Sequence, residues 1–208
     1  VAQRSASVTG LGAAAGYFTC DRWKAELGNT AGRFTMSQTA DGPNGVSANC
    51  LKLDCTTADT SIAAGEFVYI EQNLEGQNVQ RMGKGVAGAK QVTLSFYVKA
   101  SAAFTFVAEI QDFDNARIIG KSYTTTTDWV RHEIIFDADT DDGSSPFDDN
   151  NAASLAVNFW IHGGSNFTSG TLNTSWQNRT DANRYVGGSS FFSSTDNNFF
   201  ITGVQMEV

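Results

Sequence analysis

The sequence predicts an all-β protein, a two-layer antiparallel β-sandwich of the jelly-roll type. Apolar and polar residues alternate over many short stretches with the two-residue period of a strand that buries one face. Glycine is abundant at 20 residues and proline scarce at 2, and Thr, Ser, Asn and Asp crowd the segments between the apolar runs. A tally of about eight or nine strands at irregular spacing favours a jelly roll over an immunoglobulin-like sandwich, while the strand order stays open.

The stretch 91–112 carries the strongest alternation. One side of its first run holds Val92, Leu94, Phe96, Val98 and Ala100. The pattern then resumes, and one side of the second run holds Phe104, Phe106, Ala108 and Ile110. We therefore predict a hairpin. Because an isolated pair of strands is marginal in water, a second layer must cover its apolar face.

Residues 1–16 have no period and many small side chains, which predicts an N-terminal arm or linker ahead of a single domain over 17–208. Val8 and Leu11 would let this arm lie along the sheet edge of a neighbouring subunit. Within the domain, glycine and proline predict a turn at 41–45, and the glycine-bounded segment 76–85 is expected to hold one helical turn. Apolar runs predict strands over 32–37, 48–55, 66–74, 117–123, 129–136, 155–162 and 199–208.

Charge and hydropathy exclude two classes of partner, and the cysteines indicate how the thiols are placed. The net charge of −8 and the pI near 4.6 argue against nucleic acid, because binding a phosphate backbone needs clustered Lys and Arg. No apolar run reaches the length that spans a bilayer, so we expect no membrane insertion. The cysteines form an odd set, Cys20, Cys50 and Cys55, and the last two would point to opposite faces of a strand. We expect buried thiols that act as small apolar side chains.

Seven phrases are distributed along the chain: VAQRS (1–5), DRW (21–23), LKLDCTTADTS (51–61), EGQN (75–78), LSFYVKA (94–100), SGTLNTSW (169–176) and ITGVQMEV (201–208). Together they resemble a family of bacteriophage virion proteins, often tail fibres or tail-associated, that carry a jelly roll like that of carbohydrate-binding modules. The resemblance covers nearly the whole chain. In such proteins the first phrase follows an N-terminal segment and the last runs on into further sequence, so the chain resembles a piece of a longer protein.

The resemblance implies a structural subunit of a virion or surface appendage, on the outside of an extracellular particle. Its partners would be copies of itself, as a homo-oligomer, and other virion proteins. The alternative is a carbohydrate-binding module that recognises a host-surface polysaccharide. Related sugar-binding jelly rolls often hold a structural calcium with an acidic residue near the last strand, and this chain departs from that pattern with Thr202 and Gly203.

Aromatic residues on outer sheet surfaces are the candidates for glycan binding. The apolar face of a pyranose stacks on a ring while its hydroxyls bond to rigid polar groups. The candidate residues are Tyr69, Tyr97 and Trp160 on these surfaces, together with Trp176 and Tyr185 in the long segment 163–198, which could form a binding tip, a subunit contact or a lid. The alternative is that the long segment 163–198 or a neighbouring subunit covers these rings. We favour this alternative, because large aromatic side chains are usually covered and that segment is too long to be idle.

An acidic cluster over 137–149 is the candidate calcium site. Its possible ligands are Asp137, Asp139, Asp141 and Asp148, with Gly143 among them. The spacing resembles a calcium-binding loop, but the glycine comes one residue late, the last acid is Asp rather than Glu, and Pro146 interrupts the loop. We favour a solvated acidic turn over a calcium site.

Catalysis has little support in the sequence. The two histidines, His132 and His162, lack metal-ligand spacing, and no G-x-S-x-G motif is present. A glycosidase would need two facing carboxylates, which the sequence does not show. We therefore expect no enzyme and no cofactor apart from the calcium considered above. The structural and binding functions differ in whether the outer aromatic side chains are buried between subunits or line an open groove.

Overall fold

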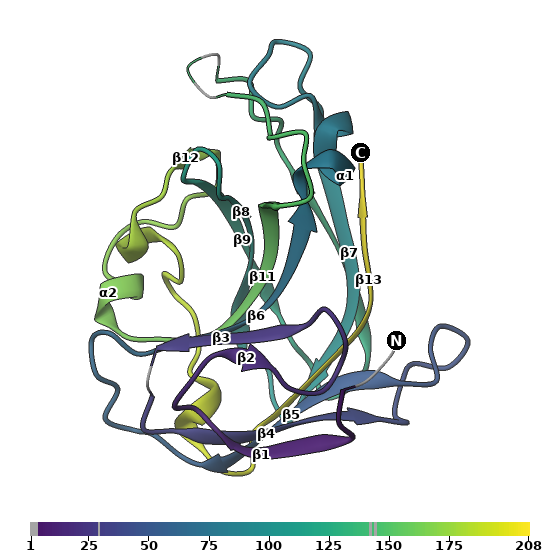
Figure 1. Cartoon of the computed structure of the whole chain (residues 1–208). Helices are drawn as coiled ribbons and strands as arrows, with labels where there is room; N and C mark the ends of the chain where they lie inside the picture. The colour runs from purple at the N-terminus through teal and green to yellow at the C-terminus, as the bar shows by residue number, and fades with distance from the viewer. Residues whose placement is uncertain (1–3, 29, 142, 144) are drawn as a thin grey trace.

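Two antiparallel sheets face one another in the computed structural model, which describes residues 4–28, 30–141, 143 and 145–208 (Figure 1). The predicted fold class, an all-β two-layer sandwich of the jelly-roll type, is confirmed. Among these residues, no helix is long and apolar enough to cross a membrane.

The six-stranded sheet has the order β1-β4-β5-β13-β7-β10, and its neighbouring strands are antiparallel. Its strands are β1 (Ser7–Leu11), β4 (Arg33–Thr39), β5 (Cys50–Thr57), β7 (Val92–Ala100), β10 (Val130–Phe136) and β13 (Asn198–Glu207). The last strand of the chain therefore lies inside the sheet, between β5 and β7.

The seven-stranded sheet has the order β12-β9-β8-β11-β6-β3-β2. Its strands are β2 (Gly16–Tyr17), β3 (Lys24–Gly28), β6 (Phe67–Glu75), β8 (Thr105–Asp112), β9 (Arg117–Thr124), β11 (Ala153–Gly163) and β12 (Gln177–Asn178). Short helical turns complete the described chain: α1 (Gly76–Val79), η1 (Gln80–Met82), α2 (Ser165–Thr168), η2 (Asp181–Asn183) and η3 (Phe191–Ser193). The helical turn expected within 76–85 is present as α1 and η1.

The predicted hairpin over 91–112 is wrong, although both of its strands exist. β7 pairs with β10 and β13 in one sheet, whereas β8 pairs with β9 and β11 in the other. Residues 101–104 carry the chain between the sheets, so Leu94 and Ile110 enter one core from opposite layers, both fully buried. Alternation shows that a strand buries one face, but it does not distinguish a partner beside the strand from a partner across the core.

Part of the expected N-terminal arm belongs to the sandwich instead. β1 pairs with β4, with Val8 opposite Met36, and Leu11 is buried in the core. β2 pairs with β3 at the edge of the other sheet. Residues 1–3, where the expected arm begins, lie outside the described residues. The segment that was expected to pair with a neighbouring subunit therefore pairs with the chain's own sheet.

The central strands of the seven-stranded sheet, β8 and β11, are buried on both faces. On β11, Val157 and Phe159 belong to the core, while Asn158 and Trp160 on the opposite face are fully buried as well. The segment 164–197 covers this second face; α2 lies on the side of the sheet away from β7 and β13 (Figure 1), whereas the end of the segment reaches β5, where the Asn197 carbonyl accepts the Cys55 N–H at 2.9 Å. We call this segment the lid.

Candidate functional site

The five aromatic residues predicted to bind a glycan do not form one surface. Trp160, Tyr185 and Tyr69 are 0%, 1% and 6% exposed. The ring of Trp160 stacks on that of Tyr185 with centroids 5.8 Å apart, and it lies 4.6 Å from the ring of Tyr69. Tyr97 and Trp176 are half-buried, and the Trp176 indole donates to a backbone carbonyl at 2.7 Å. The expected outward exposure of Trp160 is wrong because the lid covers it, which is the alternative that the sequence favours.

A buried ion pair fixes the lid to the seven-stranded sheet. Arg184 donates to the two carboxylate oxygens of Glu109 at 3.0 and 2.6 Å and to Gln111 Oε1 at 2.8 Å. Its guanidinium also lies over the ring of Trp160, 4.6 Å from the centroid. Burial alone lowers the pKa of Arg184, and the Glu109 carboxylate more than offsets this, so the pKa lies above its ordinary value. The chain's own charges thus close this face to a ligand.

The aspartates expected to bind calcium interact with the chain's own donors. Arg117 donates to both carboxylate oxygens of the buried Asp139 at 2.8 and 2.9 Å, and it lies 2.8 Å from Asp141. Asp137 and Asp148 each accept a hydrogen bond from a nearby side-chain amide. The guanidinium of Arg117 therefore joins the two aspartates whose charge would attract an ion, which favours the acidic turn over a calcium site.

A groove opens at the side of the sandwich, between β13 of one sheet and β6 of the other. It is lined by the loop 20–23, the end of β4, the segment 46–51, Gln72 of β6, and Ile201–Val204 of β13, and it encloses about 600 Å³. We call it the side groove. The half-buried Trp23 lines it, and its ring also contacts the core ring of Phe159 at 6.0 Å. The groove thus has an aromatic wall that the core supports.

Amide side chains line the side groove where two apolar rows end. On β4 the row Phe34 and Met36 is buried, and Gln38 continues it into the groove; on β6, Gln72 follows Ile70 in the same way. Neither amide forms a side-chain hydrogen bond within the described part of the chain. The sequence analysis missed both residues. A glutamine in a row that otherwise faces the core is the signal that could have found them, because an unbonded amide is not stable in an apolar interior.

A strained turn places Arg22 at the side groove. The carbonyl of Cys20 accepts the Trp23 N–H at 3.3 Å, and Arg22 within this turn has a φ of 65°. The left-handed region costs a residue other than glycine roughly 1–2 kcal/mol. Arg22 is exposed, and among the described residues its guanidinium has no partner. The strained position and the free guanidinium make Arg22 a candidate for contacting a ligand.

A second hollow continues the side groove. It encloses about 670 Å³ and shares Asp21, Arg22 and Gln72 with the side groove. Tyr17, which is 40% exposed, lines this hollow. The guanidinium of Arg4 lies 5.2 Å from the Tyr17 ring centroid and 3.6 Å from the Asp21 carboxylate. The two hollows together form an elongated surface with aromatic, amide and charged groups.

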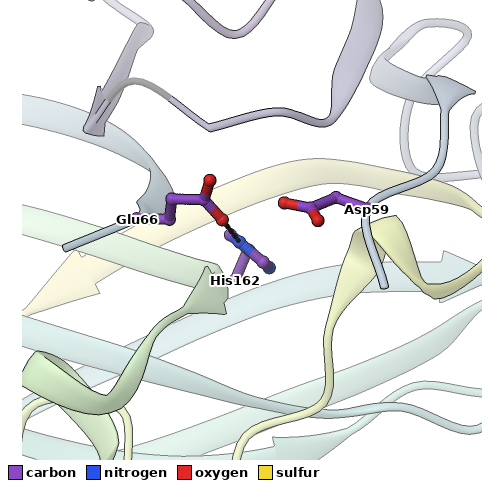
Figure 2. A group of neighbouring side chains, drawn as sticks. All are labelled: Asp59, Glu66 and His162. Carbon is purple, nitrogen blue, oxygen red and sulfur yellow. Dashed lines mark ion pairs between the residues drawn. The ribbon is translucent and has the colours of Figure 1, made fainter. Parts of the chain in front are cut away.

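A buried cluster of two acids and a histidine lies outside the lining of the side groove (Figure 2). One ligand atom from each of Asp59, Glu66 and His162 lies within 4.8 Å of the other two. Burial raises the pKa of Glu66, and the neighbouring carboxyl of Asp59 raises it further. Burial also lowers the pKa of His162 to about 4, so its imidazole is neutral at neutral pH. Two carboxylates and a neutral imidazole are a donor set that can hold a metal ion.

No family model and no curated protein matches the sequence. Solved structures with a similar fold include carbohydrate-binding modules and a phage tailspike domain. The family 11 carbohydrate-binding module from Clostridium thermocellum, in complex with a β-1,3-1,4-mixed-linked tetrasaccharide, is 12% identical with a TM-score of 0.43, over 98% of this chain and 95% of that one. TmCBM61, in complex with β-1,4-galactotriose, is 8% identical with a TM-score of 0.43, over 90% of this chain and 88% of that one.

The enzymatically active domain of tailspike protein 4 from bacteriophage CBA120 is 12% identical with a TM-score of 0.46. The match covers 89% of this chain, which spans 19% of the length of that one. With TM-scores below 0.5, these likenesses are too loose to assign a function to the chain.

Proposed function

We propose that this chain is a carbohydrate-binding module that holds an oligosaccharide in the side groove and does not cleave it. The observation that carries the proposal is the presence of unbonded amides, on Gln38 and Gln72, in a groove that Trp23 also lines. Each amide offers two donors and two lone pairs, which suits hydroxyl groups, and the indole ring offers an apolar surface. A pyranose presents both kinds of group, with hydroxyls around its edge and C–H groups on its faces.

The size of the groove supports a ligand longer than one sugar ring. The two hollows enclose about 600 and 670 Å³ and meet at shared residues, and each volume is in the range of ordinary ligand pockets. Tyr17 would provide a second ring beyond the side groove, and Arg22 would bond to the ligand between the two hollows. This arrangement fits an extended oligosaccharide with at least two ring contacts.

The setting implied by the sequence resemblance stays a prediction. A virion location, homo-oligomeric contacts and other virion proteins as partners all concern contacts between chains, whereas the structure describes one chain. A host-surface polysaccharide is the ligand that would unite this setting with the side groove.

The proposal is tested by screening the labelled chain on a glycan array and titrating the best ligand by calorimetry. Gln38→Ala and Gln72→Ala should each weaken binding about fivefold, the value of one hydrogen bond of about 1 kcal/mol. Gln177→Ala is the matched control, because Gln177 is an exposed amide on the opposite edge strand β12. An array without signal, or a ligand that the Gln38→Ala/Gln72→Ala double variant binds as the wild type does, contradicts the proposal.

Replacement of Arg22 by Gly separates ligand binding from folding. Glycine adopts a positive φ without strain, and an exposed arginine without a partner loses no contact, so Arg22→Gly should leave stability unchanged or raise it by up to about 1 kcal/mol. Affinity should fall roughly tenfold, as expected when a charged hydrogen bond is lost. Arg22→Asn should do the same, since Asn tolerates this conformation. Unchanged affinity in both variants would remove Arg22 from the site.

A further inference from the structure

We propose that Asp59, Glu66 and His162 bind a divalent transition-metal ion of the zinc type, at a site separate from the side groove. Asp59 and Glu66 lie at the two ends of the connection from β5 to β6, and His162 lies near the end of β11 (Figure 2). Their ligand atoms lie within 4.8 Å of one another. All three residues are buried, and the His162 side chain is 0% exposed.

The imidazole of His162 presents an unbonded nitrogen to the carboxylates. Nε2 is buried and has no hydrogen-bond partner in the described part of the chain. It lies 3.7 Å from Glu66 Oε2, which is too long for a hydrogen bond. Two ligand atoms that each lie about 2.1 Å from one tetrahedral ion are roughly 3.4 Å apart. The observed separation therefore fits an ion held by both atoms better than a direct bond between them.

Ser190 in the lid orients the imidazole. Its Oγ lies 2.9 Å from His162 Nδ1 and also accepts the Phe192 N–H at 3.2 Å. When Nδ1 donates its proton to Ser190, the lone pair of Nε2 points toward the carboxylates, and an acceptor then faces acceptors. Histidines that bind metals usually engage their second ring nitrogen in this way. His162 is therefore oriented to act as one of three donors to a cation.

Backbone amides hold the two carboxylates in place. Glu66 accepts the N–H groups of Ala31 and Ala63, both at 3.2 Å, and Asp59 accepts the N–H of Ser61 at 3.1 Å. These neutral donors fix the carboxylates but do not cancel their charge. A divalent ion would offset buried negative charge, and its ligands would have to move only from separations within 4.8 Å to roughly 3.4 Å.

The donor set selects the class of metal. Calcium and magnesium prefer oxygen ligands, whereas an imidazole nitrogen beside two carboxylates suits zinc and neighbouring first-row metals. The three residues are buried, and they leave the fourth position of a tetrahedral ion to a water molecule or to a second carboxylate oxygen. A bound ion would tie the β5–β6 connection to β11 and, through Ser190, to the lid. Metal binding would therefore stabilise the closed lid.

The experiment uses the full chain without an affinity tag, unfolded in guanidinium with EDTA and refolded in either zinc or calcium. After desalting, bound metal is counted by mass spectrometry and the melting temperature is measured. Wild type should retain about one zinc per chain and melt at a higher temperature with zinc than without it. His162→Gln and Glu66→Gln should lose this zinc and the shift. His132→Gln is the matched control, because the chain has only these two histidines, and it should behave as the wild type.

Ser190→Ala keeps all three ligands and tests the site even if a ligand variant fails to fold. It should still bind zinc, with an affinity roughly 10–100-fold weaker than that of the wild type. The proposal is overturned if wild type refolded in zinc retains none, or if His162→Gln retains as much as wild type, which would place zinc on surface acids. A melting shift produced by calcium and not by zinc would also overturn it. None of these results depends on glycan binding.

Discussion

Replacement of Arg184 by Met should release the lid from the seven-stranded sheet. Methionine keeps an apolar stem of similar length, so the substitution removes mainly the charge. It leaves the carboxylate of Glu109, which is 1% exposed, with the side-chain donors of Asn158 at 2.9 Å and Trp160 at 3.2 Å. Both of these donors are neutral. The variant therefore creates a buried negative charge without its cation.

The expected loss of stability follows from the burial of the Glu109 carboxylate. Breaking a buried ion pair by removing one partner costs about 3–5 kcal/mol, far more than an exposed pair contributes. For a domain of this size, each kcal/mol lowers the melting temperature by roughly 2–4 °C, so Arg184→Met should melt about 10 °C below the wild type. Adding Glu109→Gln removes the unpaired charge and keeps an oxygen for Asn158, so the double variant should recover about half of the loss.

The assay is a double-mutant cycle measured by chemical denaturation and followed by both far-ultraviolet circular dichroism and tryptophan fluorescence. The lid covers Trp160, so fluorescence reports on its release while circular dichroism reports on the sheets. Strictly additive effects of the two substitutions, or a loss below about 1 kcal/mol for Arg184→Met, would refute the view that this pair holds the lid closed.

Three further outcomes follow from buried or occupied groups. All three cysteines are buried, and burial raises the pKa of the Cys50 thiol to about 11. Thiol reagents should therefore react slowly with the native protein at pH 8, and they should label three thiols after unfolding. Fast labelling of the native protein would contradict this. Millimolar calcium should leave the melting temperature unchanged, because Arg117 already forms ion pairs with Asp139 and Asp141. A melting temperature that rises saturably with calcium, and no longer does so in Asp139→Asn, would contradict this prediction. Deleting residues 1–11 should lower the melting temperature by several degrees, because Leu11 leaves the core; an unchanged melting curve would mean that β1 is dispensable.

The strands could be predicted from the sequence, but their pairing could not. Alternation locates β7 and β8 closely because each strand places a row of apolar side chains, such as Leu94 and Ile110, in the core. The same rows are compatible with two strands paired in one sheet and with two strands in facing sheets. Both arrangements bury one side of each strand and therefore leave the same pattern in the sequence. The β8–β9 hairpin, which pairs Asp112 with Arg117, is recognisable because a short polar turn separates the two strands.

The candidate site could not be predicted from the sequence, for a related reason. Trp160 and Tyr69 alternate with core residues as exposed aromatic residues would, and only the fold shows that a segment later in the chain returns to cover them. Gln38 and Gln72 carry the opposite signal, a polar residue in a core-facing row, and its meaning depends on the two strands lying at the same opening. For the same reason, Asp59 and Glu66 offer no metal-ligand spacing with His162 until the fold brings them together.

The lid decides where a ligand can bind. On the covered face, Tyr185 stacks on Trp160 and Arg184 bonds to Glu109, so the lid already supplies the ring contact and the polar contacts that a sugar would make there. We therefore expect an external ligand to use the side of the sandwich, where the apolar rows end and the side-chain amide of Gln72 has no hydrogen-bond partner in the described chain. Consequently Arg184→Met should lose stability but retain, at a temperature where it is folded, the glycan affinity that Gln72→Ala loses. Loss of affinity in both variants would instead place the ligand beneath the lid.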